Sequence, residues 1–299
     1  MALVASISGA VAATPAGLEE WMSRVADRAA KVPPRFDEND VHDLRVALRR
    51  CRTMADTLSE VNPSPAWRRL KKATGPVFRA LGELRDAQVT AALVEKFGSA
   101  RNPVRRHMLR LLWAKERECR AAAAKALDDF DRKEWRRLAR KLGAKARFFP
   151  IESVVFQRLA LERLNAAAEL YQQARRKRSS GAWHRLRIGL KRFRYVADNF
   201  LPRRYDLWAD DLKRIQDSLG ELHDLDVLRA AIRREASRFD PAVLAPWYKM
   251  IDEERKSRLA ATNAKLHGSQ SVWLVWRAGL PLGHALTVAP ASQRQRRTA

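Results

Sequence analysis

The sequence predicts an all-α protein built from two copies of one unit. The 299 residues include only 12 Gly and 13 Pro, while Ala, Leu and Arg dominate, a composition that favours helix over sheet. Two phrases occur twice and in the same order: HDLRVALRRCRTMADTL at 42–58 with HRLRIGLKRFRYVADNF at 184–200, and LGELRDAQV at 81–89 with LGELHDLDV at 219–227. Such repetition indicates an internal duplication.

Apolar periodicity and helix-boundary residues divide the first copy. Periodicity begins near Leu18 and breaks at Pro33-Pro34, and the acidic residues from Asp37 to Asp40 begin a helix that runs to about Glu60. After a turn at 62–65, a helix from Trp67 is expected to be interrupted near Gly75-Pro76. Further helices are predicted at about 84–98, 103–129 and 132–145, and Pro150 ends the first copy.

The second copy repeats this order. It is expected to contain a long helix at 152–178, the repeated phrase at 184–200, and helices near 205–219, 225–237 and 241–267. Beyond Gly268 the helical periodicity of apolar residues is lost, and Gly, Pro, Ser and Arg become frequent. The predicted divisions are a flexible N-terminus (1–16), a first helical half (17–150), a second helical half (151–267) and a poorly ordered C-terminal tail (268–299).

On a helix, each copy of the first phrase separates into an apolar stripe and a row of cations, the row lying about 100° from the stripe. The stripes are Val41, Leu44, Leu48, Cys51, Ala55 and Leu58, and Trp183, Leu186, Leu190, Phe193, Ala197 and Phe200. The rows are His42, Arg45, Arg49 and Arg52, and His184, Arg187, Lys191 and Arg194. Each helix is therefore predicted to bury its stripe and to hold its cations at the edge of the core.

The charge of the chain points to a polyanionic partner. Lys and Arg number 59 against 34 Asp and Glu, which gives a net charge of +25 and an isoelectric point of about 11.1. A surplus of this size suits nucleic acid, an anionic membrane surface or a chain of phosphates. A solvated basic helix face is the alternative, but like charges at i, i+3 and i+4 repel, and each phrase holds few carboxylates.

The two phrases, each with a leading His and R-x-x-x-[RK]-R-x-R spacing, resemble the CHAD family, the conserved histidine α-helical domain. The paired LGEL-[RH]-D phrases strengthen the resemblance, which covers roughly 17–267. It implies two four-helix-bundle-like halves related by pseudo-two-fold symmetry, with a basic central groove. It also implies binding of inorganic polyphosphate and association with polyphosphate granules. The E-x-E-x-K signature of the CYTH domain, to which many relatives are fused, is not found, so the chain looks like the stand-alone form.

The polyphosphate site that this resemblance implies consists of cations and two histidines. Arg offers bidentate hydrogen bonds to phosphate oxygens, whereas Lys acts as a point charge. Near neutral pH the imidazoles are mostly uncharged, and protonation beside phosphate predicts tighter binding as pH falls from about 8 to 6. By motif position, the resemblance implies that the groove is lined by His42, Arg45, Arg49, Arg52, His184, Arg187, Lys191 and Arg194. The predicted site also includes Arg50 and Arg192, which are paired in the repeated phrase, and Lys71 and Lys213, which follow Leu70 and Leu212 at comparable places and are expected to add contacts from a second helix.

Two glycines and two aspartates of the LGEL phrases have structural interpretations. Gly82 and Gly220 are expected to allow a close helix approach or a break. Asp86 and Asp224 are expected to be helix N-caps or to form salt bridges with a neighbouring Arg.

An enzyme is the less favoured class. His42-Asp43 and His223-Asp224 resemble the adjacent pair of metal-dependent phosphohydrolases, but each copy lacks the pair that the other holds. No Gly-rich phosphate loop, H-E-x-x-H helix or G-x-S-x-G elbow occurs. We therefore expect no catalytic residue, no metal and no cofactor.

A nucleic-acid-binding protein is the alternative. The basic stretches 132–147 and 175–178 suit it, but no recognition module is present. The cysteines Cys51 and Cys119 form no metal or disulfide pattern, which fits a reducing cytoplasm. The sequence contains no run of 18 apolar residues that would predict a membrane span. Residues 1–16 lack the basic start of a signal peptide, so none is expected.

Overall fold

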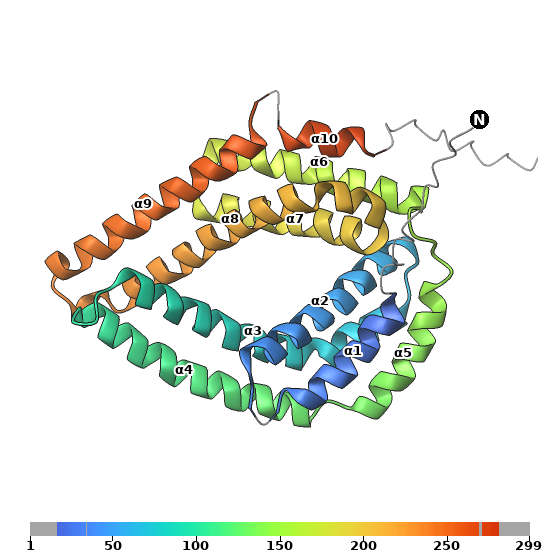
Figure 1. Cartoon of the computed structure of the whole chain (residues 1–299), viewed down its shortest axis with the longest axis horizontal. Coiled ribbons are helices and arrows are strands. Elements are labelled where there is room, and N and C mark those ends of the chain that lie inside the picture. Colours follow the sequence, from blue (N-terminus) through green and yellow to red (C-terminus); the bar gives the residue numbers. More distant parts are fainter. Residues whose placement is uncertain (1–16, 34, 269–270, 281–299) are drawn as a thin grey trace, which may run out of the picture.

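The structure, a computed structural model, describes residues 17–33, 35–268 and 271–280. Within these ranges it contains ten α-helices and no strand, so the all-α prediction is confirmed (Figure 1). The helices are α1 (Leu18–Lys31), α2 (Glu38–Val61), α3 (Pro65–Phe97), α4 (Pro103–Asp128), α5 (Arg132–Ala146), α6 (Val154–Lys177), α7 (Ser180–Phe200), α8 (Pro202–Arg234), α9 (Pro241–Leu266) and α10 (Val272–Ala278), with the 3₁₀ turn η1 (Ala236–Arg238) before α9.

The ends of several helices follow from local chemistry. Proline stands in the first turn of α3, α4, α8 and α9, where its missing N–H would have no helical partner in any case. Side-chain oxygens accept N–H groups that the first turn leaves unpaired. The residues that cap in this way are Ser64, Asn102, Asp131, Ser179 and Asp240.

Two helices are longer than the sequence predicts. The expected interruption at Gly75-Pro76 is wrong, because α3 continues through Pro76 to Phe97. The expected break between 219 and 225 is also wrong, because α8 runs unbroken over Gly220. Pro76 is exposed, while its neighbours Thr74 and Val77 are buried. Core packing on that face outweighs the single hydrogen bond that proline removes.

Buried apolar side chains form two clusters. The main cluster contains residues of α1, α2, α5, α6, α7 and α10, the first parts of α3 and α8, and the last parts of α4 and α9. The tip cluster joins the ends of α3 and α8 to the beginnings of α4 and α9, at the left of Figure 1. Both α3 and α8 therefore contribute to both clusters.

The chain before and after Pro150 forms two groups of neighbouring helices. Helices α1, α2, α3, α4 and α5 pack among themselves, and so do α6, α7, α8 and α9. The groups meet where α2 packs on α7 and where α3 packs on α8. The main cluster runs through both groups, so the two segments share one core.

The segment predicted to be a poorly ordered tail contains a packed helix. In α10, Val272 and Trp276 are buried, and the Trp276 ring lies 5.6 Å from that of Phe193. The Trp273 indole donates to the carbonyl oxygen of Leu266 at 3.1 Å. The apolar SVWLVW sequence explains this packing. Residues 1–16 and 281–299, also predicted to be poorly ordered, lie outside the described residues.

Candidate anion-binding site

The two repeated phrases form most of α2 and α7, and their apolar stripes are buried as predicted. Every residue of both stripes is less than 5% exposed, which fixes the rotation of each helix against the core. The residues one row away then lie at the edge of the core. Arg45, Arg49, Arg187 and Lys191 are half-buried, and we call these four side chains the cation cluster.

The members of the cation cluster lie near one another although they come from different helices. Burial lowers the pKa of Arg187 and of Lys191 on α7, and the charge of Arg49 on α2 lowers both further. Burial likewise lowers the pKa of Arg45, and Arg49 adds to the effect. Charges that perturb one another in this way lie within one electrostatic neighbourhood. The structure thus brings the middle of the two predicted rows together.

Within the described residues, no carboxylate pairs with any member of the cation cluster, and their side chains make no hydrogen bonds. Two of their nitrogens, Arg45 Nη1 and Arg187 Nε, are buried atoms without a hydrogen-bond partner. Desolvated and unpaired cations destabilise a fold. An anion that binds between them would remove this penalty.

Lys191 is the most perturbed cation of the cluster. Burial, followed by the charges of Arg187 and Arg49, lowers its pKa from 10.5 to about 8. Its ammonium group therefore titrates close to the physiological range, whereas the guanidinium groups stay protonated.

Two carboxylates lie beside the cation cluster, one on α3 and one on α8. Burial raises the pKa of Asp86, while Arg45, Arg187 and Lys191 act in the opposite direction. Burial also raises the pKa of Asp224, which Arg187 opposes. The expectation that these residues cap helices is wrong, because both lie in the middle of long helices, and in the described residues neither forms a salt bridge. They offset part of the repulsion among the cations.

Gly82 leaves room for the Arg45 side chain. A Cβ atom at Gly82 would lie 3.5 Å from Arg45 Nη1, so the guanidinium packs against the backbone of α3. The expected close approach is therefore that of a side chain rather than of a second helix. Gly220, the repeat counterpart on α8, has no such neighbour within 4 Å.

The two histidines that begin the rows have different surroundings. His42 is exposed and lines a cavity of about 260 Å³ with Arg45, Arg85 and Glu38, of which the last two form an ion pair. His184 is also exposed, and its Nδ1 lies 3.3 Å from Nδ1 of His223 on α8. At one end of the candidate site His42 therefore lies beside the guanidinium of Arg85. At the other end His184 lies beside the imidazole of His223.

His223 is a candidate site residue that the sequence analysis considered only for catalysis. Burial lowers its pKa from 6.5 to about 4, and Arg187 and His184 add to the effect. The ring is therefore neutral at physiological pH, and its Nδ1 can accept a hydrogen bond from His184. Its place opposite Arg85 in the repeated LGEL phrase was the sequence signal that could have identified it.

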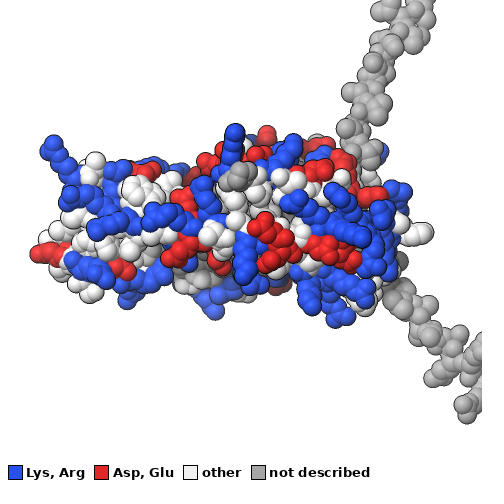
Figure 2. Space-filling view, turned by 90° about the horizontal axis from the view of Figure 1, so that it is seen from below, with Lys and Arg blue, Asp and Glu red and all other residues white. Residues whose placement is uncertain are grey.

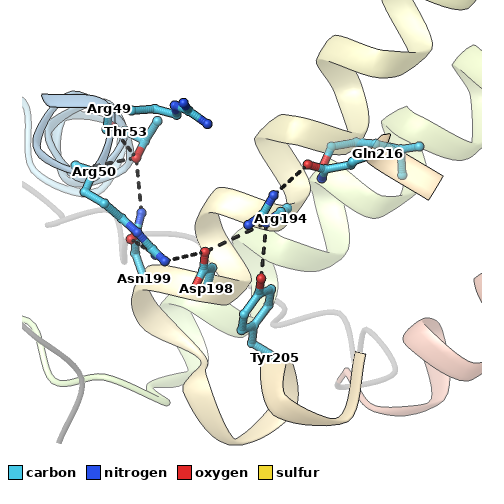
Figure 3. A network of polar contacts seen from close by, with 9 residues as sticks. Arg49, Arg50, Thr53, Arg194, Asp198, Asn199, Tyr205 and Gln216 are labelled. Atoms are coloured by element: carbon cyan, nitrogen blue, oxygen red, sulfur yellow. Dashed lines mark hydrogen bonds and ion pairs between the residues drawn. The ribbon is translucent and has the colours of Figure 1, made fainter. Parts of the chain in front are cut away.

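Three of the predicted site residues are bonded within the protein instead, and Figure 3 shows the contacts of two of them, Arg50 and Arg194. Arg50 pairs with Asp198 at 2.8 Å and donates to Asn199 Oδ1 at 2.8 Å. Arg52 donates to the carbonyl oxygen of Lys71 at 2.7 Å and to Thr74 Oγ1 at 3.0 Å. Arg194 donates to Gln216 Oε1 at 3.0 Å and to the Tyr205 hydroxyl at 3.2 Å. These side chains join helices to one another.

The remaining predicted residues lie apart from the cation cluster. Lys71 pairs with Asp56 at 2.5 Å and lines a second cavity together with Arg192. Lys213 is exposed and pairs with Asp217 at 3.2 Å. Sequence spacing grouped these residues with the rows, but the structure does not.

Two further findings concern the part of the chain that the structure describes. No group of three or more His, Cys, Asp or Glu side chains there is placed to hold a metal ion. No helix there has both the length and the apolar character that crossing a membrane requires.

The fold and the cluster define a class: all-α proteins in which two repeated helices bring unpaired cations together. The family model of the CHAD domain matches residues 16–233, so the chain belongs to the CHAD domain family. It is also similar to the solved structure described as "Crystal structure of the CHAD domain from the plant Ricinus communis", with 25% identity and a TM-score of 0.57. That match covers 90% of this chain and 89% of the other. A comparison with curated proteins gave no match.

Proposed function

We propose that this protein binds inorganic polyphosphate through the cation cluster and does not act on it as an enzyme. One observation carries the proposal: the four cations of α2 and α7 lie together, half-buried, without carboxylate partners in the described structure. A chain of phosphates supplies an anion to each cation in turn, and charge-assisted hydrogen bonds to Arg are strong. The rows would line a basic groove between two halves related by pseudo-two-fold symmetry.

The surroundings of the aspartate on α3 support access from solvent. Asp86 is exposed to water, yet enough protein surrounds its carboxyl to raise the pKa by desolvation. A phosphate that approaches Asp86 from solvent would therefore also meet Arg45, Arg187 and Lys191, whose charges all reach Asp86.

The test is a binding titration with long-chain polyphosphate, with single-stranded DNA as competitor. We expect tight binding of polyphosphate that excess DNA does not reverse, and an affinity that falls steeply with salt because bound counterions are released. Equal affinity for the two polymers would contradict a phosphate-specific site.

One observation favours the second candidate, a nucleic-acid-binding protein. Figure 2 shows Lys and Arg side chains spread over this face of the molecule, with Asp and Glu between them. On α5, Lys133, Arg136, Arg140 and Lys141 have no carboxylate partner within the described residues. Such surfaces bind any phosphate backbone without sequence preference. In the titration they would appear as a weaker second phase that DNA displaces.

The pH dependence should have an alkaline limb caused by Lys191. The polyanion binds the protonated form more tightly, so affinity is fully present below the free-protein pKa of about 8 and falls as pH rises through it. We expect a loss of about fivefold between pH 7.5 and 9.5, the contribution of roughly one partly buried cation. In Lys191→Arg this limb should disappear, and its persistence would contradict the assignment.

Contact of the two leading histidines with phosphate remains a prediction. His42 and His184 are exposed at the ends of the rows, where their ring N–H groups can donate to phosphate oxygens. Replacing both by alanine should weaken polyphosphate binding in the same titration without changing the alkaline limb caused by Lys191. We further propose that the protein acts in the cytoplasm, on polyphosphate granules, and fluorescence microscopy of a tagged chain would test this.

A further inference from the structure

A second cavity, of about 470 Å³, lies between α2, α3, α6 and α7, and no member of the cation cluster lines it. This volume is within the usual range for small-molecule sites. The cavity combines side chains from before and after Pro150. Its walls are formed by Thr53, Asp56, Thr57, Ser59, Glu60, Lys71, Arg163, Arg192, Tyr195 and Val196.

The charges in this cavity are mixed, unlike those of the cation cluster. Lys71 pairs with Asp56 through Oδ1, and Arg163 pairs with Glu60 through Oε2. The second oxygen of each carboxylate makes no bond within the described residues. Arg192 is exposed and has no acidic partner there, so one cation is free to take an anion.

Hydroxyl groups complete the wall. The Thr53 and Thr57 hydroxyls donate to backbone carbonyls of their own helix and can still accept. The hydroxyls of Ser59 and Tyr195 make no hydrogen bond among the described residues, so they can both donate and accept. The cavity therefore offers three cations, two carboxylates with a spare oxygen and four hydroxyls.

This set of groups selects among ligand classes. A long phosphate chain would place negative charges against Asp56 and Glu60, and a polyamine would meet three cations. A sugar or polyol that carries one phosphate satisfies both sets: the phosphate pairs with the cations, and the hydroxyls donate to the spare carboxylate oxygens. We propose that this cavity is a binding site for a small phosphate monoester of a sugar or polyol, distinct from the polyphosphate site.

The position of the cavity gives such a ligand a structural consequence. Thr53 accepts a hydrogen bond from Asn199 at 3.2 Å, and it stands one helical turn from Arg49 (Figure 3). A ligand that contacts both α2 and α7 beside this bond would hold these two helices together. Binding should therefore raise the melting temperature.

The test is calorimetric titration of the full chain with glucose 6-phosphate, glycerol 3-phosphate and inositol 1-phosphate. Glucose, which has the hydroxyls without a phosphate, and inorganic phosphate, which has no polyol hydroxyls, serve as comparison probes. We expect at least one of the esters to bind saturably and more tightly than both of these. Arg192→Ala should weaken that binding about tenfold, the usual effect of losing one charge-assisted hydrogen bond.

Two controls separate this site from the polyphosphate site. Lys213→Ala, at the repeat counterpart of Lys71, and the double variant Arg45→Ala/Arg187→Ala should both bind the ester as the wild type does. The proposal is overturned if none of the three esters binds saturably, or if the ester is lost in the double variant but kept in Arg192→Ala. It is also overturned if Arg192→Ala weakens polyphosphate binding as much as the double variant does.

Discussion

Replacing Arg45 and Arg187 together by alanine should lower the affinity for polyphosphate by about 100-fold or more. Each residue has a buried side-chain nitrogen without a hydrogen-bond partner, Arg45 on α2 and Arg187 on α7. A hydrogen bond to a charged group contributes about 1.5–3 kcal/mol, so two such bonds account for an effect of this size. Titration of the wild type and the double variant at one fixed salt concentration measures it.

The matched control is Arg136→Ala/Arg140→Ala. This variant also removes two positive charges, but from the exposed face of α5, and it should lower the affinity for polyphosphate only slightly. The Arg45/Arg187 variant should also melt at the temperature of the wild type or above it, because it removes two desolvated cations. Equal losses in the two double variants would show that net charge, and not the cluster, determines binding.

Arg50→Ala should destabilise the protein by about 2–3 kcal/mol, which corresponds to a fall in melting temperature of roughly 5–10 °C. Arg50 binds Asp198 and Asn199 at the contact between α2 and α7, and it also stacks over Trp21 at 5.3 Å. Its Asp198 partner has a side chain only 9% exposed, so the variant leaves a carboxylate nearly buried with only Arg194 at 3.9 Å.

The adjacent residue provides the control for this prediction. Arg49 occupies the same helix and is also half-buried, but its side chain has no partner within the described residues and lies beside the network of Figure 3 without joining it. Arg49→Ala should leave the melting temperature unchanged or raised while weakening polyphosphate binding. If urea unfolding gave the two single variants equal stabilities, Arg50 would not be the residue that holds the contact.

The sequence predicts the centre of the candidate site better than its ends. Helical period and repetition were enough to identify Arg45, Arg49, Arg187 and Lys191, because a buried stripe fixes the rotation of the helix and hence of the next row. The same helical spacing also placed Arg52 and Arg194 in the predicted rows of cations. Their partners Thr74 and Gln216 lie 22 residues further along the chain, so spacing within one phrase could not indicate them.

The acidic side of the site depends on tertiary structure. Asp86 and Asp224 lie beside the cations on α3 and α8, and both helices continue past the expected breaks. Local signals at Gly75-Pro76 and Gly220 favoured shorter helices, and core packing overrode them. His223 was missed for a related reason, since its contact with His184 joins residues 39 positions apart.

The continuity of α3 and α8 also determines how the molecule comes apart. Each of these 33-residue helices is anchored in the main cluster at one end and in the tip cluster at the other. Melting either cluster alone would leave half of two long helices without packing, and an isolated helix of that length is barely stable in water. We therefore expect the two clusters to unfold as a single cooperative unit. Backbone amides in the middle of both helices should exchange with deuterium only through global unfolding, and much more slowly than those of the seven-residue α10.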